Sequence, residues 1–388
     1  MDFKKQTTEK YAIVIGDWHF NSLGLVRSLG EMGITVFFIN LSLFGYAENS
    51  KYVKKFFHVT APEEIFTTIV MITKEVAGIP FLFPASDLAA MFLDNYYSQL
   101  KDICVCPGAK GNLERFMSKD EMCRLARNNG FNVPEFYKIS IDAQWIKNLK
   151  NIPFPFIIKP EKSVDGNKSE IRICTNETDL KQAIDWIEKH LNEIKVLFVQ
   201  QFVNGNNNLM VEYCGYKIQD KPVKLIGQLE KIREYPVNRG STSFAVIKNN
   251  ITYLDVEYLN SFLNEVEFDG IFDLELKVVD GHPYFIEINF RNGAPSYAFT
   301  VGGFNIPFNW LCEHSGLQIQ QTHSFKETFL MSERDDLNHV IEKKLNVFSW
   351  LKNLKNCDTL MIYNKADKKP FIKAYNKIIC LLTSFFTK

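Results

Sequence analysis

The feature that most constrains this chain is the segment Phe268–Arg291, which reads as two strands joined by a tight turn. The turn, Val-Asp-Gly-His-Pro, contains the Asp-Gly pair that favours a two-residue hairpin. Side chains at i and i+2 share one face of a strand, so the polar residues of the two strands are expected to meet on one face. That face comprises Asp273, Glu275 and Lys277, with Phe285, Glu287, Asn289 and Arg291; Ile286, Ile288 and Phe290 lie opposite. It fits either a Mg²⁺ site facing phosphate oxygens or the solvated side of an ordinary hairpin, and both interpretations stay open at this point.

The composition narrows the class of protein. With 388 residues the chain is long enough for two or three domains, and 46% apolar and 23% charged residues are typical of a soluble globular protein. The formal net charge of zero gives no indication of a nucleic-acid partner. The eight cysteines lack paired CxxC spacing, which argues against a zinc site and favours a reduced, cytoplasmic environment.

The two ends of the chain carry different patterns. Near the amino terminus the apolar run YAIVIG is too short for a signal peptide, and no stretch approaches the roughly 20 apolar residues of a membrane span. The carboxy-terminal stretch KKPFIKAYNKIICLLTSFFTK has the pattern of an amphipathic helix. We interpret it as a helix docked on the core, with a peripheral membrane contact as the alternative.

The first third alternates strand and helix patterns. Strands are predicted at 11–17, 34–40, 56–60, 80–87 and 103–107, which implies a parallel sheet with helices on both faces. Ligands of such folds lie beyond the carboxyl ends of strands, here near Asp17, Asn21 and Asp87. Neither GxGxxG nor GxxxxGK[ST] occurs, so a dinucleotide fingerprint and a P-loop are both excluded. His19 is interpreted as a turn residue or a minor substrate contact rather than a catalytic base.

The middle of the chain contains pieces suited to a polyphosphate. A helix is predicted from Ser118, as its N-cap, to Gly130, with Lys119 at its start. Strand FPFIIKP ends on Lys159 and precedes a small-residue loop at 163–169, whose backbone N–H groups could cover phosphates. A further strand, VLFVQQFV, ends on Gln200–Val203. Either an ordinary strand end or a backbone that reads an adenine edge fits this segment.

Basic residues gather between positions 227 and 246. This segment contains Lys231, Arg233 and Arg239 beside a Gly-Ser-Thr turn. The cluster suits an anionic ligand, either phosphate or carboxylate. A solvated charged strand is the alternative.

Taken in order, these pieces resemble the ATP-grasp superfamily, and within it the carboxylate–amine ligases, over roughly residues 10–315. The resemblance implies that Lys119 and Lys159 contact the nucleotide and that the 163–169 loop, with Ser163 and Gly166, is the phosphate lid. It further implies that Gln200, Gln201, Phe202 and Val203 form the adenine-binding hinge. In the hairpin it implies Glu275, Glu287 and Asn289 as Mg²⁺ ligands and Arg291 as the arginine that steadies the phosphoryl and tetrahedral species.

The sequence departs from the family pattern in two places. The lid keeps only Gly166 where the family is richer in glycine, and Asn206, Asn207 and Asn208 follow the hinge where an acidic ribose ligand is usual. An asparagine such as Asn208 can still hydrogen-bond a ribose hydroxyl. The YP-x-x-x-G-S-T piece at 235–242, together with RSLGEMGI, looks most like the D-aspartate-ligase-type members, which join an amino acid to an amine in cell-wall precursors.

The resemblance implies an α/β protein with an ATP-grasp fold and a Rossmann-like N-terminal domain. The expected segments are 1–112, 113–195, 196–315 and a C-terminal extension at 316–388. The implied reaction uses ATP with one or two Mg²⁺, or Mn²⁺, to form an acyl phosphate that a small-molecule amine attacks. Arg233 and Arg239 are candidates for holding the carboxylate or the terminal phosphate. Bicarbonate-dependent carboxylation, polysaccharide-linked biosynthesis and a non-catalytic nucleotide-binding protein are the alternatives, and a homodimer is left open.

Overall fold

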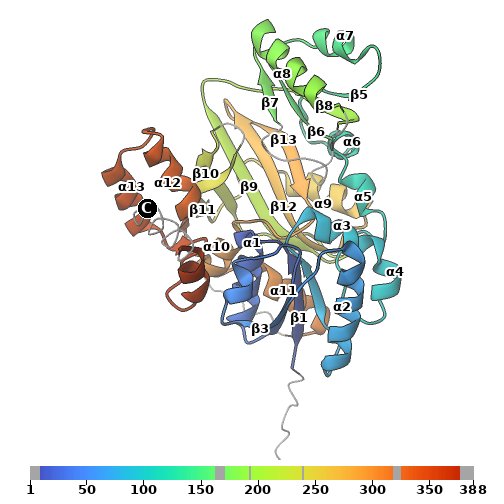
Figure 1. Ribbon diagram of the computed structural model, residues 1–388, viewed down its shortest axis with the longest axis vertical. Helices are drawn as coiled ribbons and strands as arrows, with labels where there is room; N and C mark the ends of the chain where they lie inside the picture. The colour runs from blue at the N-terminus through green and yellow to red at the C-terminus, as the bar shows by residue number, and fades with distance from the viewer. Residues whose placement is uncertain (1–8, 162–170, 192–193, 238–239, 318–324, 376–388) are drawn as a thin grey trace, which may run out of the picture.

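Three sheets build the protein (Figure 1). The computed structural model describes residues 9–161, 171–191, 194–237, 240–317 and 325–375. In Figure 1 the N-terminal sheet lies at the bottom, a seven-stranded sheet fills the centre, and a four-stranded sheet with α7 and α8 lies at the top. This arrangement confirms the predicted α/β class. None of the helices in the described ranges combines the length and the apolar character that a membrane span requires.

The N-terminal sheet is parallel, in the order β3-β2-β1-β4. Its strands are β1 (Tyr11–Gly16), β2 (Thr35–Asn40), β3 (Val53–His58) and β4 (Phe81–Pro84), and its helices are α1 (Phe20–Gly30), the 3₁₀ turn η1 (Ala47–Asn49), α2 (Pro62–Glu75), α3 (Asp87–Asn95) and α4 (Tyr97–Leu100). Every residue of β1 is buried, because even-numbered side chains face α1, α10 and α11 while odd-numbered ones face α2 and α3. Continuous apolar runs are therefore the correct pattern for these strands.

The fifth predicted strand of this region, at 103–107, is reduced to one parallel bridge between Phe81 and Val105. The chain leaves the sheet immediately afterwards. At Gly108, where φ is 143°, the backbone exchanges both hydrogen bonds with Asp269 instead, at 2.8 and 2.9 Å. A long-range pairing thus replaces the local one that the apolar sequence predicted.

The upper sheet is antiparallel, in the order β5-β8-β6-β7. It comprises β5 (Phe136–Ser140), β6 (Phe156–Pro160), β7 (Arg172–Cys174) and β8 (Val196–Gln201), covered by α7 (Trp145–Lys150) and α8 (Glu177–Lys189). Two helices, α5 (Leu113–Phe116) and α6 (Lys119–Asn128), precede it. The predicted helix limits are confirmed: Ser118 occupies the N-cap position of α6, and Gly130 takes φ 93°.

The central sheet has the order β13-β12-β9-β10-β11-β14-β15. Its strands are β9 (Asn208–Lys217), β10 (Gln228–Tyr235), β11 (Ser241–Lys248), β12 (Gly270–Val279), β13 (His282–Asn289), β14 (Thr328–Met331) and β15 (Thr359–Leu360). The associated helices are α9 (Val256–Glu265), α10 (Ser296–Gly302), α11 (Ile306–Ser315), α12 (Glu333–Ile341) and α13 (Val347–Asn356). The predicted hairpin is β12–β13, and Asp280 and Gly281 form its turn with φ of 49° and 87°.

Packing crosses the predicted segment boundaries. Helices α10 and α11 share one apolar core with β1 and α1 of the N-terminal sheet, and β14 pairs with β11. Arg27 of α1, which is fully buried, donates to Asp367 at 3.1 Å and to the carbonyl oxygens of Met361 and Ile362. Within the described residues 325–375, the chain is therefore built into the central sheet and bonded to the N-terminal unit. The boundaries at 112, 195 and 315 stay predictions.

Candidate active site

A cavity of about 1100 Å³ lies where the three sheets meet. Strand ends of the N-terminal sheet, β6, the β8–β9 connection, β10 and β11, the hairpin and α12 all contribute to its lining. Among the predicted site residues, those that line it are Lys119, Lys159, Gln200, Gln201, Phe202, Val203, Asn208, Arg233, Glu275, Glu287, Asn289 and Arg291. Ser163, Gly166 and Arg239 lie outside the described residues. The structure thus brings together residues that are up to 172 positions apart in the chain.

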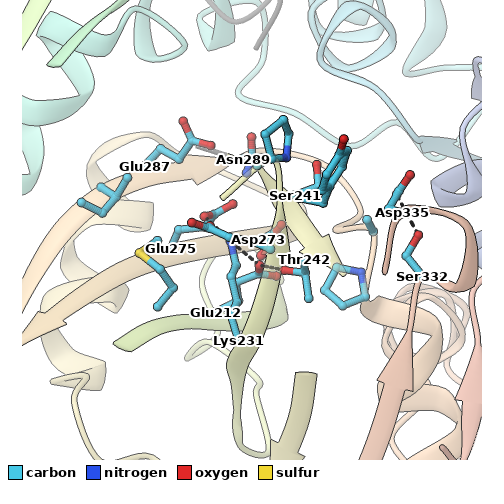
Figure 2. Close-up of a pocket in the computed structure, with 18 of the residues that line it drawn as sticks. Glu212, Lys231, Ser241, Thr242, Asp273, Glu275, Glu287, Asn289, Ser332 and Asp335 are labelled. Atoms are coloured by element: carbon cyan, nitrogen blue, oxygen red, sulfur yellow. Dashed lines mark hydrogen bonds and ion pairs between the residues drawn. The ribbon is translucent and has the colours of Figure 1, made fainter. Parts of the chain in front are cut away.

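Strand register arranges the acidic residues of the cavity in rows. Glu275 pairs directly with Glu212 of β9 on one side and with Glu287 of β13 on the other. Carboxylates directly opposite one another on a sheet repel, so a row of three is unfavourable without a cation. Figure 2 shows this row in the cavity, with Ser332 and Asp335 at the right of the view.

A β-bulge corrects the predicted hairpin face. Glu275 pairs with Glu287, but the next pair is Leu276 with Phe285, so Ile286 is the extra residue. Phe285 is consequently buried in the core, and Ile286 lines the cavity, which reverses their predicted places. The bulge reverses the alternation on β13 at this point, and therefore allows Glu287 and Asn289 to face the cavity while Phe285 packs inside.

Lys231 of β10 is buried against this row. Its Nζ lies 2.8 Å from Glu212 Oε1 and 2.9 Å from Glu275 Oε2, and its side chain is only 6% exposed. Burial alone would lower the pKa of Lys231, but attraction to the two glutamates outweighs it and raises the pKa well above its ordinary value. Thr242 Oγ1 also donates to Glu212 Oε1, at 2.7 Å. The permanent charge of Lys231 offsets only one of the three carboxylates in the row.

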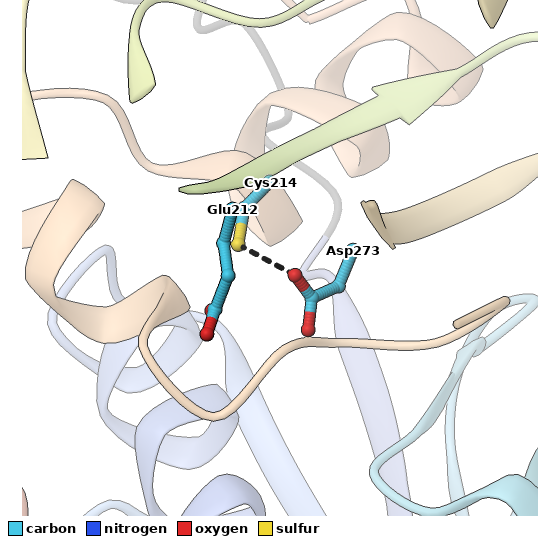
Figure 3. A group of neighbouring side chains, drawn as sticks. All are labelled: Glu212, Cys214 and Asp273. Carbon is cyan, nitrogen blue, oxygen red and sulfur yellow. Dashed lines mark hydrogen bonds between the residues drawn. The ribbon is translucent and has the colours of Figure 1, made fainter. Parts of the chain in front are cut away.

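A second row crosses the sheet two residues before Glu275 on β12. There Asp273 pairs with Cys214 of β9 on one side and with Asn289 of β13 on the other. Figure 3 shows Glu212, Cys214 and Asp273 together, and the Cys214 thiol lies 3.5 Å from Asp273 Oδ1. Burial raises the pKa of Cys214 well above its usual range, and the nearby Asp273 adds to this. The thiol therefore stays protonated at neutral pH and is a poor ligand for a hard cation, whereas the oxygen atoms around it are suitable ligands.

Asp273 itself is buried beside Glu212 and Glu275. Burial raises its pKa well above the ordinary value, and repulsion from the two glutamates raises it further. Arg291 opposes this shift, with its guanidinium 3.9 Å from Asp273 Oδ2. A bound cation would relieve the same repulsion. The electrostatic repulsion within the acidic cluster therefore favours binding of a metal ion such as Mg²⁺.

Two lysines face the acidic rows from the other side of the cavity. Lys159 Nζ donates to Gln200 Oε1 at 3.2 Å, and burial lowers the pKa of Lys159 while Glu287 opposes the shift. Lys119 starts α6, where its backbone N–H donates to Glu161 O at 3.1 Å, and its side chain is largely buried. Ser118 donates its hydroxyl to the Glu161 carboxylate rather than capping the helix. Buried cations of this kind suit a polyanionic ligand.

The predicted hinge lies at the end of β8. Gln200 is buried, and its Nε2 lies 3.8 Å from Cys123 Sγ, so its amide is fixed between α6 and Lys159. Lys277 lies over the Phe202 ring at 4.4 Å. Asn208 closes its own turn, because it accepts from Gly205 N at 3.2 Å and donates to Gly205 O at 2.8 Å. A ribose contact by Asn208 stays a prediction.

The two described arginines among the predicted catalytic residues have different surroundings. Arg291 donates to Asp87 Oδ1 at 3.0 Å and to Asn289 Oδ1 at 3.1 Å, so it links the hairpin to the N-terminal sheet. Arg233 forms a two-point ion pair with Asp336 of α12, at 2.9 and 2.7 Å. Binding of a substrate anion by Arg233 stays a prediction, and such binding would compete with Asp336.

The N-terminal strand ends line the cavity as predicted, but their polar groups serve several roles. Asn21 donates to Ala85 O at 2.8 Å and to Asn292 O at 2.7 Å, and accepts from Asn292 Nδ2 at 2.6 Å. The Asn21 amide therefore joins the N-terminal sheet to the segment that follows β13, and these bonds occupy it in place of a substrate. His19 is the N-cap of α1, with Nδ1 accepting from Asn21 N at 3.3 Å, and it also lines the cavity, so a minor substrate contact by His19 stays a prediction. Burial raises the pKa of Asp17.

Sequence reasoning missed Glu212. Its strand sequence LMVEYCGY is apolar on both sides of the glutamate, and a single acidic residue in a central strand is the signal that could have identified it. Lys231 was recognised only as part of a basic cluster. Its role as the partner of two glutamates depends on the β9–β10 and β9–β12 pairings.

Comparisons with known proteins agree with this fold. No family model matches the chain. An N5-carboxyaminoimidazole synthetase from Staphylococcus aureus, solved with ADP, superimposes with a TM-score of 0.65 over 87% of this chain and 86% of its own, at 14% identity. An L-amino acid ligase from Bacillus licheniformis superimposes with a TM-score of 0.58 over 78% of this chain and 73% of its own, at 16% identity. The chain has the ATP-grasp fold.

The similarity in sequence is distant. D-aspartate ligase from Enterococcus faecium is 23% identical in an alignment of 241 residues that covers 58% of this chain and 56% of the ligase. The match therefore spans little more than half the length of that curated relative. The predicted fold is confirmed, and the sequence match is to a protein of the kind that the 235–242 segment indicated.

Proposed function

We propose that this chain is an ATP-dependent ligase that joins a carboxylate to an amine and releases ADP and phosphate. One observation carries the proposal: an acidic sheet face lines the same cavity as two largely buried lysines, Lys159 on β6 and Lys119 at the start of α6. An Mg-nucleotide has the complementary distribution of charge, because its metal needs oxygen ligands and its phosphates need cations. D-aspartate ligase and the L-amino acid ligase support an amino acid as one substrate.

The carboxylate row fits a divalent cation. Glu212, Glu275 and Glu287 bring three negative charges to one line of the sheet, and Lys231 supplies one positive charge to it. We propose Glu275, Glu287 and Asn289 as the ligands of Mg²⁺, with Mn²⁺ as a substitute. When bound, the metal supplies charge neutralisation on the phosphate oxygens.

The chain's own residues supply the remaining steps. Lys119 and Lys159 hold the phosphates, and the end of β8 holds the adenine edge. A substrate carboxylate attacks the terminal phosphoryl group in line, Arg291 stabilises the charge that develops, and ADP leaves. The amine then attacks the acyl phosphate, forms the amide bond and displaces phosphate, while a proton passes from the amine to solvent or to a nearby carboxylate. Enclosure between three sheets limits hydrolysis of the acyl phosphate by water.

The test is ADP release measured with Mg²⁺ across panels of amino acids, amines and bicarbonate. We expect release that requires both a carboxylate and an amine, with formation of the amide detected by mass spectrometry. Release that requires bicarbonate in place of an organic carboxylate, together with an acceptor amine, would instead support carboxylation, the reaction class suggested by the similarity to N5-carboxyaminoimidazole synthetase. If the chain binds ATP but no combination of substrates gives nucleotide turnover, our proposal is refuted. The non-catalytic alternative, a nucleotide-binding protein, would then hold.

A matched pair of variants tests the metal ligands. Glu287→Gln keeps the size of the side chain but removes its charge, so it should abolish turnover and the Mg²⁺-dependent part of ATP-induced thermal stabilisation, while the protein stays folded. Glu257→Gln makes the same change at an exposed position on α9 and should have no effect. Full ADP release by Glu287→Gln with the true substrates would refute the metal assignment.

A further inference from the structure

Charge is distributed unevenly along this chain. The whole sequence has a formal net charge of zero, but residues 341–388 contain ten lysines, no arginine and three acidic residues, a net charge of +7. The last 13 of these residues, NKIICLLTSFFTK, are mostly apolar apart from Lys377 and Lys388. Among the described residues, those that line the cavity all come from before this region, with the exception of Ile362. The described part of the basic region, 341–375, is therefore largely separate from the candidate active site.

Helix α13 presents apolar and basic side chains to solvent together. None of its ten residues is buried. Phe348 is 77% exposed, Leu351 47% and Val347 45%. Lys352 and Lys355 are also exposed and follow Phe348 and Leu351 at helical spacing of four, so the apolar and basic side chains share one face. Large apolar side chains surrounded by lysine are the pattern of a helix that lies in a membrane interface.

Neighbouring segments extend this face. Ile341, at the end of α12, is 67% exposed, and Ile372 is 48% exposed. All eight lysines at described positions between 341 and 375 are exposed: Lys343, Lys344, Lys352, Lys355, Lys365, Lys368, Lys369 and Lys373. Figure 1 shows α12 and α13 projecting together from one side of the molecule, away from the N-terminal sheet.

The acidic residues of the region do little to reduce this charge. Asp367 is buried and held by Arg27 at 3.1 Å, and Asp358 is held by Lys326 at 2.5 Å. Glu342 pairs with Lys344 at 2.7 Å. Two of the three carboxylates are thus neutralised by partners outside the region, and the excess of lysine remains facing solvent.

We infer that this face, formed by the exposed side of α13 with Ile341 and the eight exposed lysines named above, docks on the surface of an anionic phospholipid bilayer. The lysines match the negative lipid headgroups, and Phe348 and Leu351 match the boundary between headgroups and acyl chains. Two weak contributions, charge attraction and shallow apolar insertion, together give reversible surface binding. The charge of the face therefore selects an anionic bilayer over a neutral one.

Docking in this way would place the cavity near the bilayer. On α12, Asp335 and His339 line the cavity, while Leu337 and Ile341 are exposed on the opposite side of the same helix. One helix therefore separates the membrane face from the candidate active site. An enzyme held in this position has direct access to a substrate presented at the membrane surface.

The test is co-sedimentation of the full chain with vesicles of phosphatidylcholine alone or mixed with phosphatidylglycerol, at low and high salt. We expect binding to the mixed vesicles at low salt, weaker binding at high salt, and little binding to phosphatidylcholine alone. Lys352→Glu/Lys355→Glu should weaken binding to the mixed vesicles by about tenfold or more. Phe348→Asp should also weaken it, because it removes the apolar insertion.

Matched controls separate docking from general effects of charge and from misfolding. Lys181→Glu/Lys189→Glu reverses two lysines on α8, and Ile79→Asp places a charge at an apolar residue that is 58% exposed in the N-terminal region. These variants should bind vesicles like the wild type, and all variants should keep the wild-type circular dichroism spectrum.

Two results would overturn the inference. One is absence of binding to anionic vesicles, or equal binding by the α13 variants and their controls. The other is a self-association of the wild type that Phe348→Asp abolishes, which would assign the face to contact between copies of the chain. Neither result depends on nucleotide turnover, so the inference and the proposed function fail independently.

Discussion

Replacing Lys231 by methionine tests the electrostatic organisation of the acidic rows. Methionine keeps the length of the side chain and removes the charge, so Glu212 and Glu275 lose contacts of 2.8 and 2.9 Å in a place where the lysine is only 6% exposed. Removal of one partner from a buried ion pair leaves uncompensated buried charge and costs about 3–5 kcal/mol. We expect a loss of that size in the free energy of unfolding at pH 7.

The pH dependence of this loss has a definite sign. Burial and the two glutamates raise the pKa of Asp273 well above its ordinary value, and Lys231 opposes this shift. Removal of Lys231 therefore raises the pKa of Asp273 further, so the folded state binds protons more readily than the unfolded chain. Stability of the variant falls as pH rises through this raised pKa. The difference from the wild type should be smallest near about pH 5 and largest at neutral pH.

Urea unfolding followed by circular dichroism, with EDTA present, measures this difference. Lys248→Met is the matched control, because Lys248 pairs with Glu230 at 2.6 Å on the adjacent strand but is 40% exposed. It should cost less than about 1 kcal/mol. Adding Glu212→Gln to Lys231→Met should recover part of the loss, since one uncompensated charge disappears. A loss below about 1 kcal/mol for Lys231→Met, or one that is the same at every pH, would refute this reasoning.

Three further outcomes are expected. Lys159→Met should raise the Kd for ATP about tenfold or more in calorimetric titration, since a charged hydrogen bond to phosphate is lost, whereas Lys150→Met on α7 should leave it unchanged. Arg27→Met should destabilise the protein by about 3–5 kcal/mol, measured by urea unfolding, because it leaves Asp367 buried without its partner. Burial raises the pKa of Asp17 above 3.8, so its contribution to stability falls as pH rises from 3.8 through the raised value; Asp17→Asn should flatten that part of the pH–stability curve.

The sequence was most informative where structure is determined locally. Asp280 and Gly281 specify a turn in which both residues take positive φ, and the flanking alternation specifies the strands that the structure contains. The bulge at Ile286 could not be predicted in this way. It depends on Phe285 packing in the core with distant side chains, and that packing outweighs the regular alternation of the strand.

The partners of the site residues were beyond local reasoning. Glu212 and Glu275 meet because β9 pairs with β12, 63 positions further along the chain, and strand register between distant segments is not encoded in either strand alone. The ion pair of Arg233 with Asp336 spans 103 positions. Residue types and their order therefore identified twelve residues of the cavity lining, while the charge balance inside it required the three-dimensional pairing.

The amide pair Asn21–Asn292 has a consequence for how the cavity opens. Both side chains are buried, and each donates a hydrogen bond to the other residue. They join the end of the N-terminal sheet to the segment that follows β13. Arg291 and Asp87 reinforce the same junction. The wall that carries the acidic rows is thus continuous with the N-terminal unit, and the two should move as one rigid half. Entry of nucleotide and departure of ADP are then expected to require displacement of the β5–β8 sheet, which carries Lys159, relative to that half.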